Sequence, residues 1–186
     1  VAVDHYVRIN FNSFVQIVDA VGGVDIVISK AEMEQINANN ARYAGSTAVA
    51  EDLGYMPAPV REYSEDGETP VHLDGLQAVG YARIRKLDSD FVRTSRQRRV
   101  VQAVMTALRG QLYNPLVYAR IVDVLCNNLE TNMNAVEICS LGMKALVCGQ
   151  IEQMRLPVDG TFDDNGSSIH IDAAANAQAL REFIYG

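Results

Sequence analysis

Apolar and polar positions follow two different spacings at the start of the chain. Residues 5–11 (HYVRINF) alternate apolar and polar side chains, as expected for a half-buried strand. Apolar side chains then recur at helical spacing from Phe14 to Val21. Gly22 and Gly23 supply a permissive turn after that helix, and Val24–Ile28 (VDIVI) has the composition of a second strand. A strand, a helix and a strand in succession predict an α/β sandwich.

The periodicity weakens from Ser29 to Asp74, where the pattern predicts only a short helix near residues 31–39. So long an irregular connection is uncommon unless it covers or shapes a site. We therefore interpret residues 37–72 either as a lid or as a plain surface excursion. Order resumes at LDGLQAVGYARIR, where Asp74 is expected to cap a short helix that is followed by a strand running into Arg85.

The rest of the chain is predicted to be mainly helical. Pro115 occupies a favourable first-turn position for one helix, and Asp172 is placed to cap the last. The expected elements are helices over residues 91–108, 116–126, 134–147 and 173–184, and an edge strand over residues 151–158. We expect one domain over residues 1–186, because a chain of this length with 48% hydrophobic residues can bury one substantial core.

The charge is unevenly distributed. The net charge of −7 argues against a general binder of nucleic acids or other polyanions. The segment from Arg83 to Arg99, however, contains seven lysine and arginine residues and only two aspartates. The rest of the chain contains nine basic and 21 acidic residues. The sequence therefore predicts an acidic body with one basic site.

Two sets of side chains in this basic stretch are predicted to converge. Arg83 and Arg85 are two positions apart on the expected strand, so both project from one face. Arg93, Arg96 and Gln97 lie at i, i+3 and i+4 at the start of the next helix, close to its positive dipole end. Guanidinium forks, an amide and backbone N–H groups around one volume suit a phosphate or pyrophosphate.

The basic stretch also has a simpler interpretation. Its arginines could pair with Asp88, Asp90 and other carboxylates on a solvated face. Arg98 and Arg99 point elsewhere on the helix, and we interpret them as surface charge.

The three cysteines, Cys126, Cys139 and Cys148, form no CxxC pair and have no histidine at metal-ligand spacing. They are predicted to be ordinary buried thiols, and a single disulfide among them stays open. The chain has no run of eighteen apolar residues and opens without a signal peptide, so any targeting or anchor segment is expected outside these residues.

Three segments, taken in order and spacing, resemble the LytR-CpsA-Psr family of bacterial cell-wall enzymes. They are VDHYVRINFNSFVQIVDAVGGVDIVI, LDGLQAVGYARIR and DSDFVRTSRQRRVVQAV. The resemblance is strong over residues 3–108 and looser over residues 115–186. It implies an α-β-α sandwich in which a central mixed β-sheet is flanked by helices.

The resemblance implies an extracytoplasmic phosphotransferase of Gram-positive cells, membrane-anchored in the full-length protein. Such enzymes move teichoic acid, capsular or related polymers from a polyprenyl-pyrophosphate carrier onto peptidoglycan. By this analogy Arg83, Arg85 and Arg93 are catalytic and hold the pyrophosphate together with Gln97, while Arg96 supports them or adds a further contact.

The chain departs from the family pattern at its start. Family members carry further strands upstream of VDHYVRIN, with a magnesium-binding aspartate pair and additional arginines. The Mg²⁺ ligands are therefore expected outside this chain, with Asp88 and Asp90 as weaker candidates. The chain is therefore expected to correspond to part of a longer protein, so its own activity stays open, as does its oligomeric state.

Two alternatives from other functional classes remain. One is a non-catalytic module that binds a polyprenyl phosphate or an anionic wall polymer. The other is a nucleic-acid-binding regulator, suggested only by RTSRQRR and disfavoured by the acidic remainder and the lack of interleaved aromatic residues. The sequence does not specify which glycopolymer is transferred.

Overall fold

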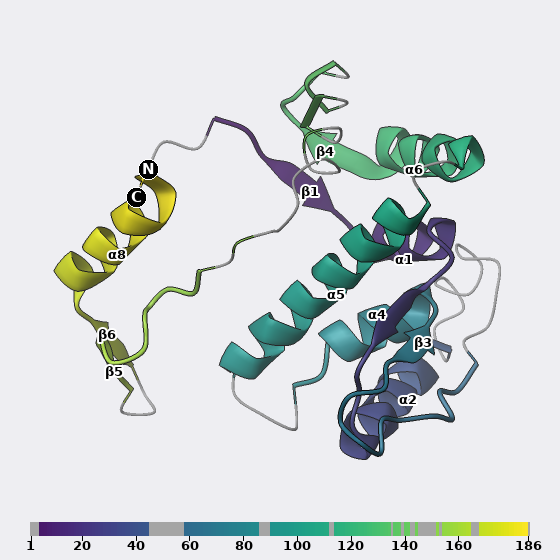
Figure 1. Cartoon of the computed structure of the whole chain (residues 1–186), viewed down its shortest axis with the longest axis horizontal. Coiled ribbons are helices and arrows are strands. Elements are labelled where there is room, and N and C mark those ends of the chain that lie inside the picture. The colour runs from purple at the N-terminus through teal and green to yellow at the C-terminus, as the bar shows by residue number, and fades with distance from the viewer. Residues whose placement is uncertain are drawn as a thin grey trace. The chain divides into compact units, whose positions relative to one another are not determined.

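The computed structural model contains two compact units, Val1–Val147 and Cys148–Gly186, which are described separately here (Figure 1). The residues that it describes are 4–44, 58–85, 90–111, 114–134, 136–138, 140, 141, 144, 152, 154–164 and 168–185. The elements of the first unit are β1 (Val7–Ile9), α1 (Phe11–Ala20), β2 (Val24–Ile26), α2 (Lys30–Ala44), β3 (Val71–Leu73), α4 (Gly75–Ala82), α5 (Asp90–Gly110), α6 (Pro115–Asn128) and β4 (Leu129–Thr131). Those of the second are β5 (Phe162–Asp164), β6 (Ile169–Ile171) and α8 (Ala173–Tyr185).

The strands that the structure describes pair in three antiparallel ladders. β1 pairs with β4, β2 with β3 and β5 with β6. In the β2–β3 ladder Val24 lies opposite Leu73, and Asp25 lies opposite His72. The apolar pair is buried, whereas the polar pair is exposed, with 2.8 Å between Asp25 Oδ1 and His72 Nδ1. The mixture of helices and short strands confirms the α/β class, and the described ladders are antiparallel rather than mixed.

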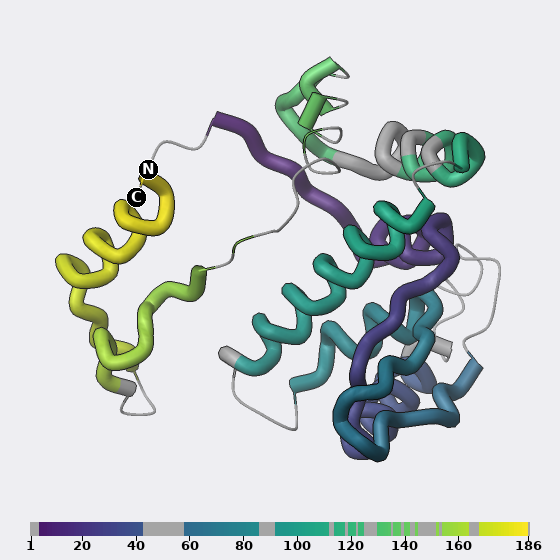
Figure 2. Tube along the Cα trace, in the orientation of Figure 1, coloured from purple at the N-terminus to yellow at the C-terminus, as the bar shows by residue number. Residues whose placement is uncertain are grey.

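Helix α4 is the centre of the first unit. Its residues from Gly75 to Tyr81 are all buried, as expected for a segment that is apolar on almost every side. It packs against α1, α2 and α5, and the tube in Figure 2 shows it between α2 and α5. The core around it includes Val18, Leu73 and Val100, each no more than 1% exposed.

Several predicted helix ends are confirmed. Asp74 and Gln77 form a capping box at α4: Asp74 Oδ1 accepts the Gln77 N–H at 2.8 Å, and Gln77 Oε1 accepts the Asp74 N–H at 3.0 Å. Asp172 Oδ1 accepts two N–H groups from the first turn of α8. Pro115 is the first residue of α6, and the two glycines after α1 adopt positive φ.

The strand predicted to run into Arg85 is wrong. The segment before Arg83 is the end of α4, and the Arg83 N–H donates to the Val79 carbonyl oxygen at 3.1 Å. The apolar side chains of this segment fit helical spacing as well as strand alternation. The capping box that begins at Asp74 favours the helix by satisfying backbone groups at its start.

The edge strand predicted over residues 151–158 is also wrong for the part that the structure describes. Residues 154–158 form no strand. The Val158 N–H donates to Asn176 Oδ1 at 2.9 Å, so a side chain of α8 takes the place of a strand partner. The helix predicted over residues 134–147 is present at its described positions between 136 and 144.

The long connection after β2 is more ordered than predicted. Helix α2 extends to Ala44. The Asn37 side chain makes two hydrogen bonds with the backbone of Val60, at 2.9 and 2.8 Å, and Gln77 Nε2 donates to the Ala58 carbonyl oxygen at 2.9 Å. The returning segment is therefore tied to α2 and α4. Residues 45–57, the middle of the predicted lid, lie outside the described residues.

Substituting Gly75 by alanine is expected to destabilise the first unit. An added Cβ would lie 2.3 Å from the Val15 carbonyl oxygen and 2.9 Å from Asp19 Oδ1, so α1 and α4 would have to separate. We expect urea titration to show a loss of about 1–3 kcal/mol in the free energy of unfolding. Gly110→Ala, where nothing lies within 4 Å of the added methyl group, is the control. Equal losses in both variants would contradict this role of Gly75.

The pH dependence of stability should report on Asp74. Burial raises the pKa of this carboxyl above its ordinary value, and the nearby Asp19 carboxylate adds to the effect. The raised pKa means that ionisation of Asp74 opposes folding as the pH rises through the native pKa. Asparagine keeps the helix cap without the charge, so Asp74→Asn should gain stability relative to wild type between about pH 4 and pH 7.

The matched control is Asp74→Ala, which removes the cap as well as the charge. Its free energy of unfolding should be about 1 kcal/mol lower than that of Asp74→Asn, both at about pH 4 and at about pH 7. Denaturant titrations at both pH values would measure these differences, and a stability gain for Asp74→Asn that did not change with pH would count against the raised pKa.

Candidate functional site

A cavity of about 920 Å³ lies within the first unit. It is formed by the end of β1, the start of α1, and side chains of α2, α4 and α5, elements that are separated along the chain but close in Figure 1. Its lining residues are Ile9, Asn10, Phe11, Phe14, Gln35, Asn39, Arg42, Val79, Ala82, Arg83, Arg85, Arg93, Gln97, Val100 and Val101.

The structure brings four of the five predicted anion-binding residues to this cavity, namely Arg83, Arg85, Arg93 and Gln97. The first two follow the end of α4 rather than a strand. Both line the cavity, whereas Ile84 between them is 1% exposed and lies in the core. Arg93 and Gln97 lie one turn apart on α5, as predicted.

The fifth predicted residue, Arg96, does not line the cavity. Its side chain is buried in the core, where Nε donates to Glu32 Oε1 at 2.8 Å. The guanidinium also lies 6.0 Å from the centroid of the Tyr81 ring. Arg93 and Gln97 are separated by about 40° around a helix and Arg93 and Arg96 by about 60° in the opposite direction. That angle is enough to place Arg96 on the inner face of α5.

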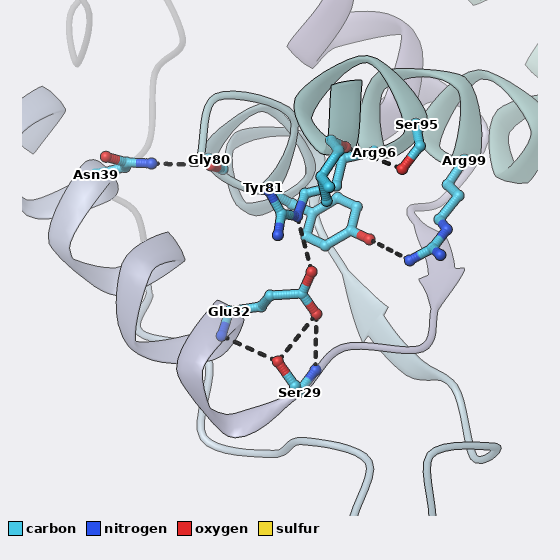
Figure 3. A network of polar contacts seen from close by, with 9 residues as sticks. Ser29, Glu32, Asn39, Gly80, Tyr81, Ser95, Arg96 and Arg99 are labelled. Carbon is cyan, nitrogen blue, oxygen red and sulfur yellow. Dashed lines mark hydrogen bonds and ion pairs between the residues drawn. The ribbon is translucent and has the colours of Figure 1, made fainter. Parts of the chain in front are cut away.

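Figure 3 shows that Glu32 joins two parts of this network. Its Oε2 accepts the Ser29 N–H at 2.9 Å and the Ser29 hydroxyl at 3.1 Å, which caps the start of α2. Its other oxygen holds Arg96 on α5. Arg99 Nη1 donates to the Tyr81 hydroxyl oxygen at 3.3 Å, and burial raises the pKa of Tyr81. The network therefore connects α2, α4 and α5, the three helices that line most of the cavity.

The walls of the cavity combine charge with apolar surface. The Arg83 guanidinium stacks 4.7 Å from the centroid of the Phe11 ring, a cation–π contact that holds the cation at the cavity edge. Ile9, Phe14 and Val101 add apolar lining beside the arginines. Such a surface suits a ligand with an anionic group attached to an apolar chain.

Sequence reasoning missed three lining residues on α2: Gln35, Asn39 and Arg42. They recur at i, i+4 and i+7, which places them on one face of the helix. The signal in the sequence was weak, because this segment is polar on several sides and its periodicity is low.

The described residues hold no group of three or more histidine, cysteine, aspartate or glutamate side chains that could bind a metal ion. Asp88, the side chains of Asp90 and Cys126, and residues Cys139 and Cys148 fall outside the described part. The expectation that the magnesium ligands lie outside this chain stays a prediction. No helix among the described residues is both long and apolar enough to cross a membrane.

The sequence matches the model of the LytR_cpsA_psr family over residues 1–183. The chain belongs to the LytR-CpsA-Psr family. It is 30% identical over 164 residues to the polyisoprenyl-teichoic acid–peptidoglycan teichoic acid transferase TagU of Bacillus mycoides, covering 86% of this chain and 44% of that protein. It is 27% identical over 139 residues to the corresponding transferase TagV of Bacillus subtilis, covering 74% of this chain and 30% of that protein. The chain thus spans less than half the length of these relatives.

Solved structures confirm the fold of the family. Bacillus subtilis TagT superposes with a TM-score of 0.65 at 20% identity, covering 98% of this chain and 60% of that chain. A second structure, TagT bound to LI-WTA, gives a TM-score of 0.64 at 20% identity, with the same coverage. Bacillus subtilis TagU gives 0.54 at 21% identity, covering 98% of this chain and 64% of that chain.

Removing Glu32 is expected to be strongly destabilising. Glu32→Ala would leave the Arg96 guanidinium buried without this counter-charge, at a cost of about 3–5 kcal/mol in the free energy of unfolding. Glu32→Ala combined with Arg96→Met should recover part of the loss, because the buried charge is then removed as well.

The exposed pair Arg8–Glu130, with side chains 77% and 68% exposed, provides the control for the buried one. Glu130→Ala should change stability by less than about 1 kcal/mol. Denaturant titration would measure these three variants together with Arg96→Met alone. A double variant that lost the sum of the Glu32→Ala and Arg96→Met effects would rule out coupling between Glu32 and Arg96.

Proposed function

We propose that this chain forms the pyrophosphate-holding part of a glycopolymer transferase. The enzyme would move a teichoic acid or capsular-type polymer from a polyprenyl-pyrophosphate carrier onto peptidoglycan. The observation that carries the proposal is the convergence of Arg83, Arg85 and Arg93 on one cavity that also has apolar walls. The relatives TagU and TagV, named as teichoic acid–peptidoglycan transferases, support the substrate class.

The geometry suits phosphoryl transfer with little covalent work by the protein. A muramic acid hydroxyl of peptidoglycan attacks the phosphorus attached to the sugar, and the new P–O bond forms as the bond to the bridging oxygen breaks. Polyprenyl phosphate leaves with the bonding electrons, and the hydroxyl proton is released. Arg83, Arg85 and Arg93 hold the pyrophosphate oxygens and neutralise the charge that develops on them.

The remaining parts of the proposal concern cofactor and location. Magnesium dependence is proposed from the family resemblance alone, and no step above depends on the ion. Action outside the cytoplasm, at the membrane of a Gram-positive cell, is proposed from the peptidoglycan named in the relatives' activity and from their Bacillus sources. A nucleic-acid-binding role is not supported, because Arg83, Arg85 and Arg93 line a cavity and Arg96 is buried in the core.

Binding of a short-chain polyprenyl pyrophosphate tests the proposal directly. Calorimetric titration with and without magnesium should show binding to wild type. Arg83→Ala combined with Arg93→Ala removes two charged donors worth about 1.5–3 kcal/mol each, so affinity should fall at least about 100-fold. Arg61→Ala removes one exposed positive charge outside the cavity and should change affinity little.

Turnover in the full-length parent separates an enzyme from a binding module. Arg93→Ala should lower transfer of a lipid-linked glycan to peptidoglycan by about 10²–10³-fold. The non-catalytic module would be favoured by two results together. The double variant Arg83→Ala, Arg93→Ala would abolish binding, and the full-length parent would show no transfer. Wild-type affinity in the double variant would refute the site.

A further inference from the structure

Helix α2 contributes a second kind of wall to the cavity. Gln35 and Asn39 are half-buried and Arg42 is exposed, and all three line the same cavity as the arginines of α4 and α5. Positions 35, 39 and 42 span about 10 Å along one face of the helix. This row, Gln35, Asn39 and Arg42, is called the α2 row below.

The α2 row is held on a rigid support. Asn39 Nδ2 donates to the Gly80 carbonyl oxygen of α4 at 3.0 Å. A Cβ at Gly80 would lie 2.6 Å from Asn40 Oδ1, so the two helices approach each other closely at this point. Glu32 ties the start of α2 to α5 through Arg96. The backbone of α2 and the Asn39 side chain are therefore positioned before any ligand arrives, which lowers the entropic cost of binding.

The hydrogen-bonding chemistry of the α2 row differs from that of the arginines. Guanidinium groups only donate, which suits phosphate oxygens, whereas the amides of Gln35 and Asn39 both donate and accept. An amide can turn its N–H groups toward a phosphate, as expected for Gln97, but its oxygen then finds no donor on that ligand. The amides instead match groups that offer O–H or N–H protons along with oxygen acceptors, as sugar hydroxyl and acetamido groups do.

We propose that the α2 row binds the sugar attached to the pyrophosphate and selects the glycan that enters the cavity. This inference rests on the proposed function, because the arginines must hold the pyrophosphate for the sugar to lie beside it. Gln35 and Asn39 contact hydroxyl or acetamido groups of that sugar, and Arg42 donates to an oxygen further along the glycan. A site built to bind such groups discriminates strongly against a ligand that lacks them.

The test compares two ligands that differ only in the sugar. One is a short-chain polyprenyl pyrophosphate, and the other is the same carrier bearing one N-acetylglucosamine. Gln35→Met keeps the length of the side chain and removes its hydrogen bonds, so affinity for the sugar-bearing ligand should fall about tenfold. Affinity for the bare carrier should stay the same. Gln35→Ala serves as the second variant, and thermal unfolding checks that both variants are folded.

Matched variants separate this inference from the proposed function. Glu34→Ala alters an exposed side chain of the same helix, outside the cavity lining, and should leave both affinities unchanged. Arg83→Ala with Arg93→Ala should weaken both ligands together. Equal effects of Gln35→Met on both ligands, or no effect on either, would overturn the sugar site while leaving the pyrophosphate site intact. Failure of wild type to bind either ligand would overturn both.

Discussion

The buried ion pair between Glu32 and Arg96 determines how the cavity is assembled. The side chains are 12% and 4% exposed, and Arg96 Nε lies 2.8 Å from Glu32 Oε1. A guanidinium is too costly to bury without a counter-charge, so the inner face of α5 can pack only where Glu32 reaches it. Glu32 also caps α2 through Ser29. One carboxylate therefore fixes the start of α2 and its distance from α5.

This pair also separates the arginines of the basic stretch by position. Arg96 is neutralised by Glu32 in the core, whereas Arg83, Arg85 and Arg93 line the cavity. The stacking of Arg83 on Phe11 restrains one of these cations at the cavity edge. The basic stretch is thus divided between one arginine of the core and three that line the cavity, although the sequence presents them as a single cluster.

Local signals in the sequence were sufficient for the helix caps. The N-caps at Asp74 and Asp172 depend on residues two to four positions apart, and both were predicted. Arg83 and Arg85 were predicted to share one side, and both line the cavity although the predicted strand is wrong. The role of Arg96 depends on a partner 64 residues away. The helical spacing of Arg93, Arg96 and Gln97 could not show which of these side chains would contact Glu32.

The α2 row escaped prediction for a related reason, and its position has a chemical logic. A helix face with two amides and one arginine gives no distinctive pattern in the sequence. It becomes recognisable as one wall of a cavity only once α4 and α5 supply the other walls. Gln35 and Asn39 lie on α2, whereas Arg83, Arg85 and Arg93 come from the segment after α4 and from α5. If the arginines hold the pyrophosphate, the two amides are placed to bind hydroxyl groups beside it. The Glu32–Arg96 pair then ties the α2 wall of the cavity to the α5 wall.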